Sequence, residues 1–387
     1  MLVLRGTVVA PDGVHPGWEV RIEGERISEV GPPSGQTSEE VLDFGEAWVM
    51  PGFIDLHTHG LGPHDPKSRE GIVGMAEWKV RFGTTGFLPS LASATEEEYL
   101  RFLDDVRSVQ DDPPEKGARV LGGHMEGPFV NPKTKGGMDE RFLRLPDPEE
   151  YRKYLVPQLK LMTLAPELPG ALELIRALRD NGTVASAGHS DAGLEDMERA
   201  VEAGLSHVCH LFNAFPERPE REKGVKQPSL LEICLATEGL TAEVNGDGIH
   251  VHPLMIRLAV RAMGVENVVL ITDSMEGTGL PEGVYRMTDG RRYRTRKGDV
   301  ARLVDSPDII VGSVLTMERG VKNLAELCGF SLHVASRMAS LNPARVLGME
   351  KEIGSIEPGK LADIAVLDHE YRVVMTLVGG EIACRGD

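Results

Sequence analysis

The chain has 387 residues, 41% of them hydrophobic, which is enough for one large domain and a smaller one. Its 42 Lys and Arg residues are outnumbered by 60 Asp and Glu residues, and the formal net charge is −18. This acidic balance argues against a nucleic-acid binder and against a protein of anionic membrane surfaces, because both need a basic face. A small anionic ligand, held by one or two local cations, is not excluded.

The N-terminal residues and the cysteines indicate the cellular compartment of the protein. The chain starts without the charged and long apolar segments of a signal peptide, and it has no apolar run of about 18 residues that could span a membrane. The cysteines form no CxxC pair and are too scattered for a disulfide framework, which fits a reducing compartment. We therefore expect a cytoplasmic protein with no membrane partner. The cysteines are Cys209, Cys234, Cys328 and Cys384.

Both ends of the chain are rich in predicted strands. The N-terminal strands are expected over 2–9, 18–23, 26–30 and 43–50, and the C-terminal ones over 363–368, 372–378 and 381–384. Strands from the two ends can pair with each other. We therefore expect a small β-sandwich domain built from residues 1–52 and 351–387.

Between the termini, apolar strands alternate with helical patterns. Strands are expected over 53–56, 84–88, 119–122, 160–164, 183–187, 207–209, 241–244 and 268–271. Helices are expected over 70–82, 96–109, 169–181, 192–203, 253–263, 317–328 and 331–340. Eight strand–helix units predict an α/β fold with a (β/α)₈ TIM barrel over residues 53–350, although a doubly wound open sheet would show the same alternation. Residues 284–305 predict an extra hairpin, with the basic run 291–298 on a solvated strand face.

Side chains that can bind a metal follow several of these strands. In chain order they are His57 and His59 after the first strand, Glu126 after the third, His189 after the fifth, His210 after the sixth and Asp273 after the eighth. Residues two apart in a strand project to one face. The carboxyl ends of barrel strands converge on one face as well, where active sites are built. The sequence therefore predicts one site that contains all six residues.

Each of these residues also has an ordinary structural interpretation. The histidine pair could be solvated, Glu126 and Asp273 could cap helices, and Ser190 or Asp191 could be the N-cap of a helix that starts near His189. Taken together, these alternatives require five coincidences at strand ends. Two further histidines, His124 and His207, are interpreted as core residues or as supports for the ligands.

The predicted site suits metal-dependent hydrolysis. Glu126, His189 and His210 could hold one divalent ion with an open coordination position, and His57 and His59 could support a second ion that Glu126 bridges. A water bound to such an ion has a lowered pKa, and Asp273 could accept its proton and deliver it to a leaving group. Nitrogen and oxygen ligands admit zinc, our first expectation, and also iron, manganese or cobalt. The reaction would take place at an amide, ester or cyclic-imide carbonyl.

Several stretches carry a family resemblance. They are PGFIDLHTHG (51–60), HMEGPF (124–129), LAPE (164–167), GHS (188–190), HLFNA (210–214), DGIHV (247–251), TD (272–273), GSVLTM (312–317) and NPAR (342–345). In these stretches, which extend over nearly the whole chain, the sequence resembles the amidohydrolase superfamily and, within it, the N-acetylglucosamine-6-phosphate deacetylase family. The HxH pair is shared with the wider superfamily, where a carbamylated lysine often bridges the metals. In the deacetylases Glu126 takes that place.

The resemblance implies roles for individual residues. Glu126, His189 and His210 would be the main ligands of one or two ions per subunit, and Asp273 would shuttle the proton. Arg221 would reach the phosphate of the neighbouring subunit's substrate in a homodimer, where a guanidinium fork suits a phosphate. The alternative is that Arg221 is merely solvated in the charged loop 217–226. The implied contacts with the sugar phosphate are Gly137, Asn213, Ala214, His250, Val311, Gly312 and Ser313.

The implied reaction converts N-acetyl-D-glucosamine 6-phosphate to D-glucosamine 6-phosphate and acetate. Met138 stands where the family often has a histidine that touches the sugar. This departure leaves open N-acetylgalactosamine 6-phosphate, or another N-acyl or cyclic amide, as the substrate. A non-catalytic scaffold of the same fold is a further alternative, against which the intact ligands and Asp273 argue.

Overall fold

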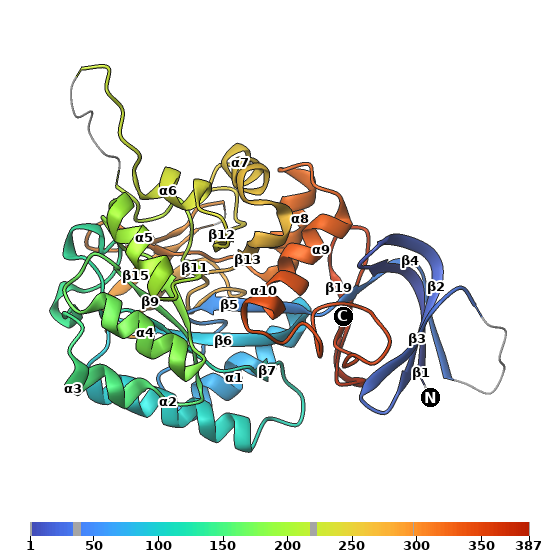
Figure 1. Cartoon of the computed structure of the whole chain (residues 1–387). Helices are drawn as coiled ribbons and strands as arrows, with labels where there is room; N and C mark the ends of the chain where they lie inside the picture. The colour runs from blue at the N-terminus through green and yellow to red at the C-terminus, as the bar shows by residue number, and fades with distance from the viewer. Residues whose placement is uncertain (1, 34–39, 217–222, 297, 387) are drawn as a thin grey trace.

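The computed structural model describes residues 2–33, 40–216, 223–296 and 298–386, and eight parallel strands form a barrel at its centre (Figure 1). In order around the barrel they are β5 (Phe53–Thr58), β6 (Thr84–Ala92), β8 (Gly123–Glu126), β9 (Leu159–Leu164), β10 (Val184–Ala187), β11 (His207–Val208), β12 (Thr241–Asn245) and β13 (Val268–Ile271). The ring closes where β5 meets the end of β13. There the Asp273 amide donates to the His57 carbonyl at 2.9 Å, and the His59 amide donates to the Ser274 carbonyl at 2.8 Å. The predicted barrel is confirmed, and the open sheet is excluded.

The third barrel strand differs from its predicted range of 119–122. The chain forms a two-residue strand, β7 (Arg119–Val120), which pairs with β6, and then breaks before β8. Gly122 lies at the break with φ +153°, and a Cβ there would lie 2.8 Å from the Gln158 carbonyl oxygen. Because of this break, the third barrel strand is β8, and Glu126 is its last residue instead of lying beyond its end.

Helices pack around the outside of the barrel (Figure 1). They are α1 (Arg69–Lys79), α2 (Glu96–Asp111), α3 (Pro148–Tyr151), α4 (Ala171–Asn181), α5 (Leu194–Ala203), α6 (Leu230–Ala236), α7 (Pro253–Met263), α8 (Met317–Glu326), α9 (Leu332–Ala339) and α10 (Leu341–Val346). All seven predicted helices occur, but α3, α6 and α10 are too short to give a clear helical period. In the described parts of the chain, no helix is long and apolar enough to cross a membrane.

Glycines decide where two of the predicted helices begin. Gly170 and Gly193 are the N-caps of α4 and α5, so both helices start two residues later than their patterns suggested. Neither Ser190 nor Asp191 caps α5. This removes the structural alternative for the segment that carries His189.

Strands from both termini pair as predicted, and they form one continuous seven-stranded sheet beside the barrel (Figure 1). Its strands in spatial order are β20 (Glu381–Arg385), β19 (Val373–Val378), β18 (Ile364–Leu367), β4 (Glu40–Pro51), β1 (Leu2–Ala10), β2 (Gly13–Glu23) and β3 (Arg26–Gly31). The join lies between β4 and β18, which run antiparallel with Val49 opposite Val366. A separate hydrophobic cluster, which includes Leu4, Val20 and Leu377, stabilises this sheet.

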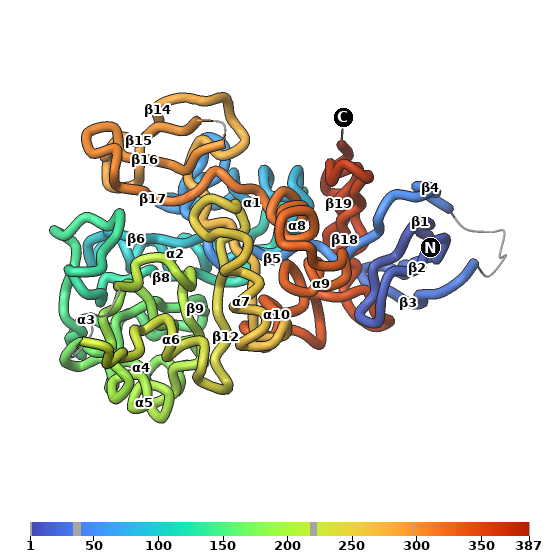
Figure 2. Tube along the Cα trace, turned by 90° about the horizontal axis from the view of Figure 1, so that it is seen from above, coloured from blue at the N-terminus to red at the C-terminus, as the bar shows by residue number. Residues whose placement is uncertain are grey.

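A third sheet follows the last barrel strand, where an extra hairpin was predicted. It has four antiparallel strands, β14 (Gly283–Arg286), β15 (Arg292–Thr295), β16 (Ala301–Leu303) and β17 (Ile310–Gly312), and it lies away from the terminal sheet (Figure 2). On β15, Arg292 and Arg294 are exposed, as predicted for a solvated strand face. Arg291 is an exception, because its guanidinium donates to the Gly137 carbonyl at 2.5 Å.

Candidate metal centre

One carboxylate and two imidazoles converge at the ends of β8, β10 and β11. Glu126 Oε1 lies 3.0 Å from His189 Nε2 and 3.0 Å from His210 Nε2. The two imidazole nitrogens are 2.9 Å apart. These residues are widely separated in sequence, and the closed barrel brings them together. They form one group whose atoms can share a single cation.

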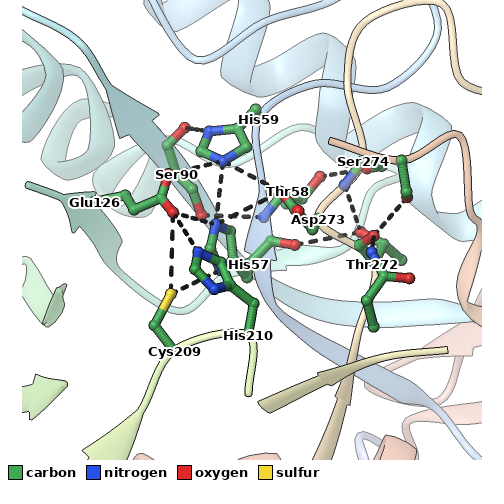
Figure 3. A network of polar contacts seen from close by, with 12 residues as sticks. His57, Thr58, His59, Ser90, Glu126, Cys209, His210, Thr272, Asp273 and Ser274 are labelled. Atoms are coloured by element: carbon green, nitrogen blue, oxygen red, sulfur yellow. Dashed lines mark hydrogen bonds and ion pairs between the residues drawn. The ribbon is translucent and has the colours of Figure 1, made fainter. Parts of the chain in front are cut away.

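A second group lies beside the first, at the seam between β5 and β13. His57 Nε2 and His59 Nε2 are 3.1 Å apart, and Asp273 Oδ1 lies 3.8 Å and 3.4 Å from them, respectively. Glu126 connects the two groups, since its Oε2 is 3.2 Å from His59 Nε2 and its Oε1 is 3.6 Å from His57 Nε2 (Figure 3). All six predicted residues therefore lie at one end of the barrel.

The contact at Nδ1 of a histidine ring determines whether its Nε2 can donate or accept. His59 Nδ1 lies 3.0 Å from the Ser90 carbonyl oxygen, and His189 Nδ1 lies 2.9 Å from the Thr134 carbonyl oxygen. A carbonyl oxygen only accepts, so both Nδ1 atoms donate, and in the neutral form of each ring the lone pair at Nε2 faces Glu126. Metal-binding histidines use their second nitrogen in this way. Imidazole lone pairs and a carboxylate oxygen at these distances are the donors of a metal site, so the residues present fit a divalent ion.

The electrostatics of the group also favour a cation. Burial opposes ionisation of Glu126, but His57, His189 and His210 together hold the pKa of this carboxyl well below its usual range. Burial lowers the pKa of His59, but the Asp273 and Glu126 carboxylates outweigh burial and raise it to about 9. Glu126 therefore stays ionised, and a divalent ion competes with protons for the imidazole nitrogens beside it.

Three of the converging residues have left-handed backbone conformations. The φ angles of His189, His210 and Asp273 are 50°, 23° and 49°, a region that non-glycine residues rarely adopt. Hydrogen bonds over-determine these turns. Glu167 accepts from the Ser190 hydroxyl at 2.6 Å, one residue after His189. The Ser313 amide donates to the Asp273 carbonyl at 2.8 Å. Each turn aims a side chain from its strand end into the site.

A cavity of about 400 Å³ opens above the two groups. It is lined by residues of both groups and by six of the predicted substrate contacts, which are Gly137, Asn213, Ala214, His250, Val311 and Gly312. Met138 lines it as well. Asp247 orients the His250 ring, because its Oδ2 lies 2.5 Å from His250 Nδ1. Through Met287 and Asp289, the four-stranded sheet forms one wall of this cavity.

One predicted substrate contact, Ser313, does not line the cavity. Ser313 is buried beneath the cavity, where its hydroxyl donates to the Thr272 carbonyl at 2.6 Å, so it supports the Asp273 turn without lining the cavity. Its neighbours Val311 and Gly312 belong to β17. Arg221 lies outside the described residues.

Comparisons with known proteins agree with this geometry. Residues 48–383 match the profile of the Amidohydrolase family, which is most of the chain. The chain belongs to the amidohydrolase family. The N-acetylglucosamine-6-phosphate deacetylase of Bacillus subtilis is 33% identical over 392 residues, covering 99% of this chain and 97% of that protein. The human protein of the same name is 32% identical over 362 residues, covering 91% and 87%.

Solved structures give the same result. The crystal structure of N-acetyl-D-glucosamine-6-phosphate deacetylase from Mycobacterium smegmatis superimposes with a TM-score of 0.90 at 31% identity, covering 99% of this amidohydrolase and 100% of that chain. A mutant of that enzyme in complex with N-acetyl-D-glucosamine-6-phosphate gives a TM-score of 0.89 at 30% identity, with 99% of each chain covered. The predicted family resemblance is therefore confirmed.

Sequence reasoning missed two buried groups beside the ligands of this amidohydrolase. Glu243, on β12, contacts His57, and the thiol of Cys209 lies 3.6 Å from His57 Nδ1. Glu243 had a detectable signal, because polar residues alternate with apolar ones along β12 and therefore line the barrel interior. The two remaining histidines lie in the interior, as interpreted. His124 contacts Ser90 and Thr163, and His207 contacts Thr241 and Glu243.

Proposed function

We propose that this chain hydrolyses the acetamide of N-acetyl-D-glucosamine 6-phosphate to D-glucosamine 6-phosphate and acetate. The observation that carries the proposal is the convergence of Glu126, His189 and His210 beside Asp273, in a cavity large enough for a sugar phosphate. Relatives whose names state this activity, and which match nearly the whole chain, support the choice of substrate.

Glu126, His189 and His210 would hold a divalent ion, zinc by our proposal, and His57 and His59 would hold a second one with Glu126 between them. When bound, such an ion acts as a Lewis acid that polarises a carbonyl oxygen and lowers the pKa of a water molecule. The open cavity next to the donors gives the acetyl group of the substrate access to this position.

Asp273 is the proposed proton carrier. Its Oδ1 atom is close to His59, and its side chain lines the cavity. The carboxylate accepts a proton from the attacking water as the new C–O bond forms. It then returns that proton to the amide nitrogen as the C–N bond breaks, so that glucosamine 6-phosphate leaves as the amine and acetate remains.

The cavity walls would orient the sugar. Asn213, Ala214 and the backbone at Gly137 and Gly312 offer polar contacts around the ring, and Asp247 holds His250 toward the cavity. Met138, a side chain without a strong hydrogen-bonding group, favours one specific alternative. Without a fixed partner for a sugar hydroxyl at this wall, the enzyme would also accept N-acetylgalactosamine 6-phosphate.

We also propose that two copies of the chain form a homodimer in which Arg221 reaches the phosphate in the neighbouring site. Exposed apolar side chains next to the His250 loop support this arrangement, and they are Ile249, Leu254, Leu258 and Leu327. Residues 1–52 and 351–387 would form a domain of their own, because their sheet has a separate hydrophobic cluster. Three buried free thiols, at Cys209, Cys234 and Cys328, support a reducing, cytoplasmic location.

The test is a deacetylase assay on N-acetylglucosamine 6-phosphate, its galactose epimer and the unphosphorylated sugar, with metal analysis before and after chelation. Asp273→Asn should lower kcat by about 10²–10⁴-fold, because the proton carrier is lost, while the ion at Glu126, His189 and His210 is retained. Turnover that persists in Asp273→Asn would remove Asp273 from the mechanism. Full activity after chelation, with no metal left in the protein, would refute the proposed function.

A further inference from the structure

A buried carboxylate lies behind the proposed metal ligands. Glu243 is fully buried on β12, and its side chain points into the barrel. Its Oε2 atom lies 3.0 Å from His57 Nδ1 and also accepts from the His210 amide at 3.1 Å. Its Oε1 atom lies 3.3 Å from His207 Nε2. One side chain therefore contacts the ring of one proposed ligand and the backbone of another.

We infer that Glu243 is a positioning residue that holds His57 as a ligand of a second divalent ion, at the group formed by His57, His59 and Asp273. This inference rests on the proposed metal-dependent function. It goes beyond that function because it makes binding of the second ion depend on a residue that touches neither substrate nor metal.

The geometry separates the roles of three of the four ligand histidines. The Nδ1 atoms of His59 and His189 are held by backbone carbonyls, which no side-chain substitution removes. His57 differs, because its Nδ1 is held by the Glu243 side chain. The Glu243 contact fixes both the tautomer and the orientation of the ring, so that Nε2 faces His59 at 3.1 Å and Asp273 at 3.8 Å. Removal of Glu243 should therefore act mainly on the second ion position.

The first ion position should survive a conservative change at Glu243. Its donors, Glu126, His189 and His210, do not use the Glu243 side chain to orient a ring. In Glu243→Gln, the amide oxygen can take the place of Oε2 and still accept from His57 Nδ1 and from the His210 amide. The amide NH₂ group would then face His207 Nε2, which can accept when its ring is neutral. The geometry is kept, and the charge that makes His57 a strong ligand is lost.

The experiment uses the full-length chain, stripped of metal and titrated with Zn²⁺ against a competing chelator. Wild type should bind two ions. Glu243→Gln should bind the first with unchanged affinity and the second about 10–100-fold more weakly, and Glu243→Ala should lose the second ion. Glu318→Gln is the matched control, since Glu318 is also a buried carboxylate but contacts Thr316 and none of the proposed ligands. It should bind both ions like wild type.

Urea unfolding of the same variants separates positioning from stability. If Glu243→Gln is destabilised but binds both ions with wild-type affinity, the residue is only structural and the inference is wrong. An equal loss of the second ion in Glu318→Gln also overturns it, because the effect is then generic to buried carboxylates. A wild-type chain that saturates with one ion overturns the inference but leaves the proposed function intact, whereas a chain that binds none refutes the proposed function. Should Glu243→Ala fail to fold, Glu243→Gln decides.

Discussion

The buried ion pair between Lys79 and Asp55 allows a sharp test of what holds the barrel closed. Lys79 Nζ, on α1, lies 2.5 Å from Asp55 Oδ2, on β5, and the two side chains are 3% and 0% exposed. Asp55 also accepts from the Thr272 amide at 3.2 Å and from the Thr272 hydroxyl at 2.7 Å. The pair therefore links an outer helix to the seam between β5 and β13, one residue before Asp273.

Lys79→Met keeps the length of the side chain but removes the cation that faces Asp55. A buried charge left without its partner typically lowers the free energy of unfolding by about 3–5 kcal/mol. For a chain of this length, the entropy of unfolding per residue converts that loss to a decrease in Tm of about 4–6 °C. Urea unfolding, followed by tryptophan fluorescence, and a thermal scan would measure both quantities.

Lys67→Met is the matched control. Lys67 Nζ lies 3.2 Å from Glu98 Oε1, but the lysine side chain is 30% exposed, so the same substitution should lower the free energy of unfolding by only about 0–1 kcal/mol. Equal losses in the two variants would contradict the argument from burial. A Lys79→Met variant whose free energy of unfolding lies within about 1 kcal/mol of the wild-type value would contradict it as well, because removing the cation beside a desolvated carboxylate should cost more than that.

Two further predictions concern pH and substrate. Burial raises the pKa of Glu318 to about 7, above the ordinary value of 4.5, although the Thr316 hydroxyl donates to it at 2.6 Å. The protonated form therefore favours the fold, and this contribution is complete below about pH 4.5 and is lost as the pH rises through about 7. When urea unfolding is measured from about pH 5 to 8, the free energy of unfolding of Glu318→Gln should rise relative to that of wild type as the pH rises. If the two free energies change with pH in parallel, Glu318 does not titrate in this range. Arg221→Ala should raise KM for the phosphorylated sugar by about 10–100-fold and leave the unphosphorylated sugar nearly unaffected; an equal change for both would exclude a phosphate contact.

Part of the proposed centre could be predicted because it depends on local chain geometry. Side chains two apart in a strand share a face, so the spacing of His57 and His59 was sufficient to pair them. The alternation of apolar strands with amphipathic helices was sufficient to place Glu126, His189, His210 and Asp273 near strand ends. To place these residues in a single site, one further rule was needed. The strands of a barrel run parallel, so their carboxyl ends lie at the same end of the barrel.

Other features depended on contacts that no local pattern contains. The break at Gly122 arises from close approach to the neighbouring strand, and the buried position of Ser313 arises from its hydrogen bond to Thr272. The contribution of the four-stranded sheet to the cavity wall was also not predictable, since its sequence pattern indicated a solvated hairpin.

The sequence by itself determined which residues end strands and which side chains share a face, because bonded geometry sets both within a few residues. Only the tertiary structure decided which strand ends meet across the ring, since that depends on hydrogen bonds between β5 and β13, more than 200 residues apart in the chain. Glu243 illustrates the difference. Its alternation along β12 was visible in the sequence, but only closure of the barrel brings this carboxylate against His57.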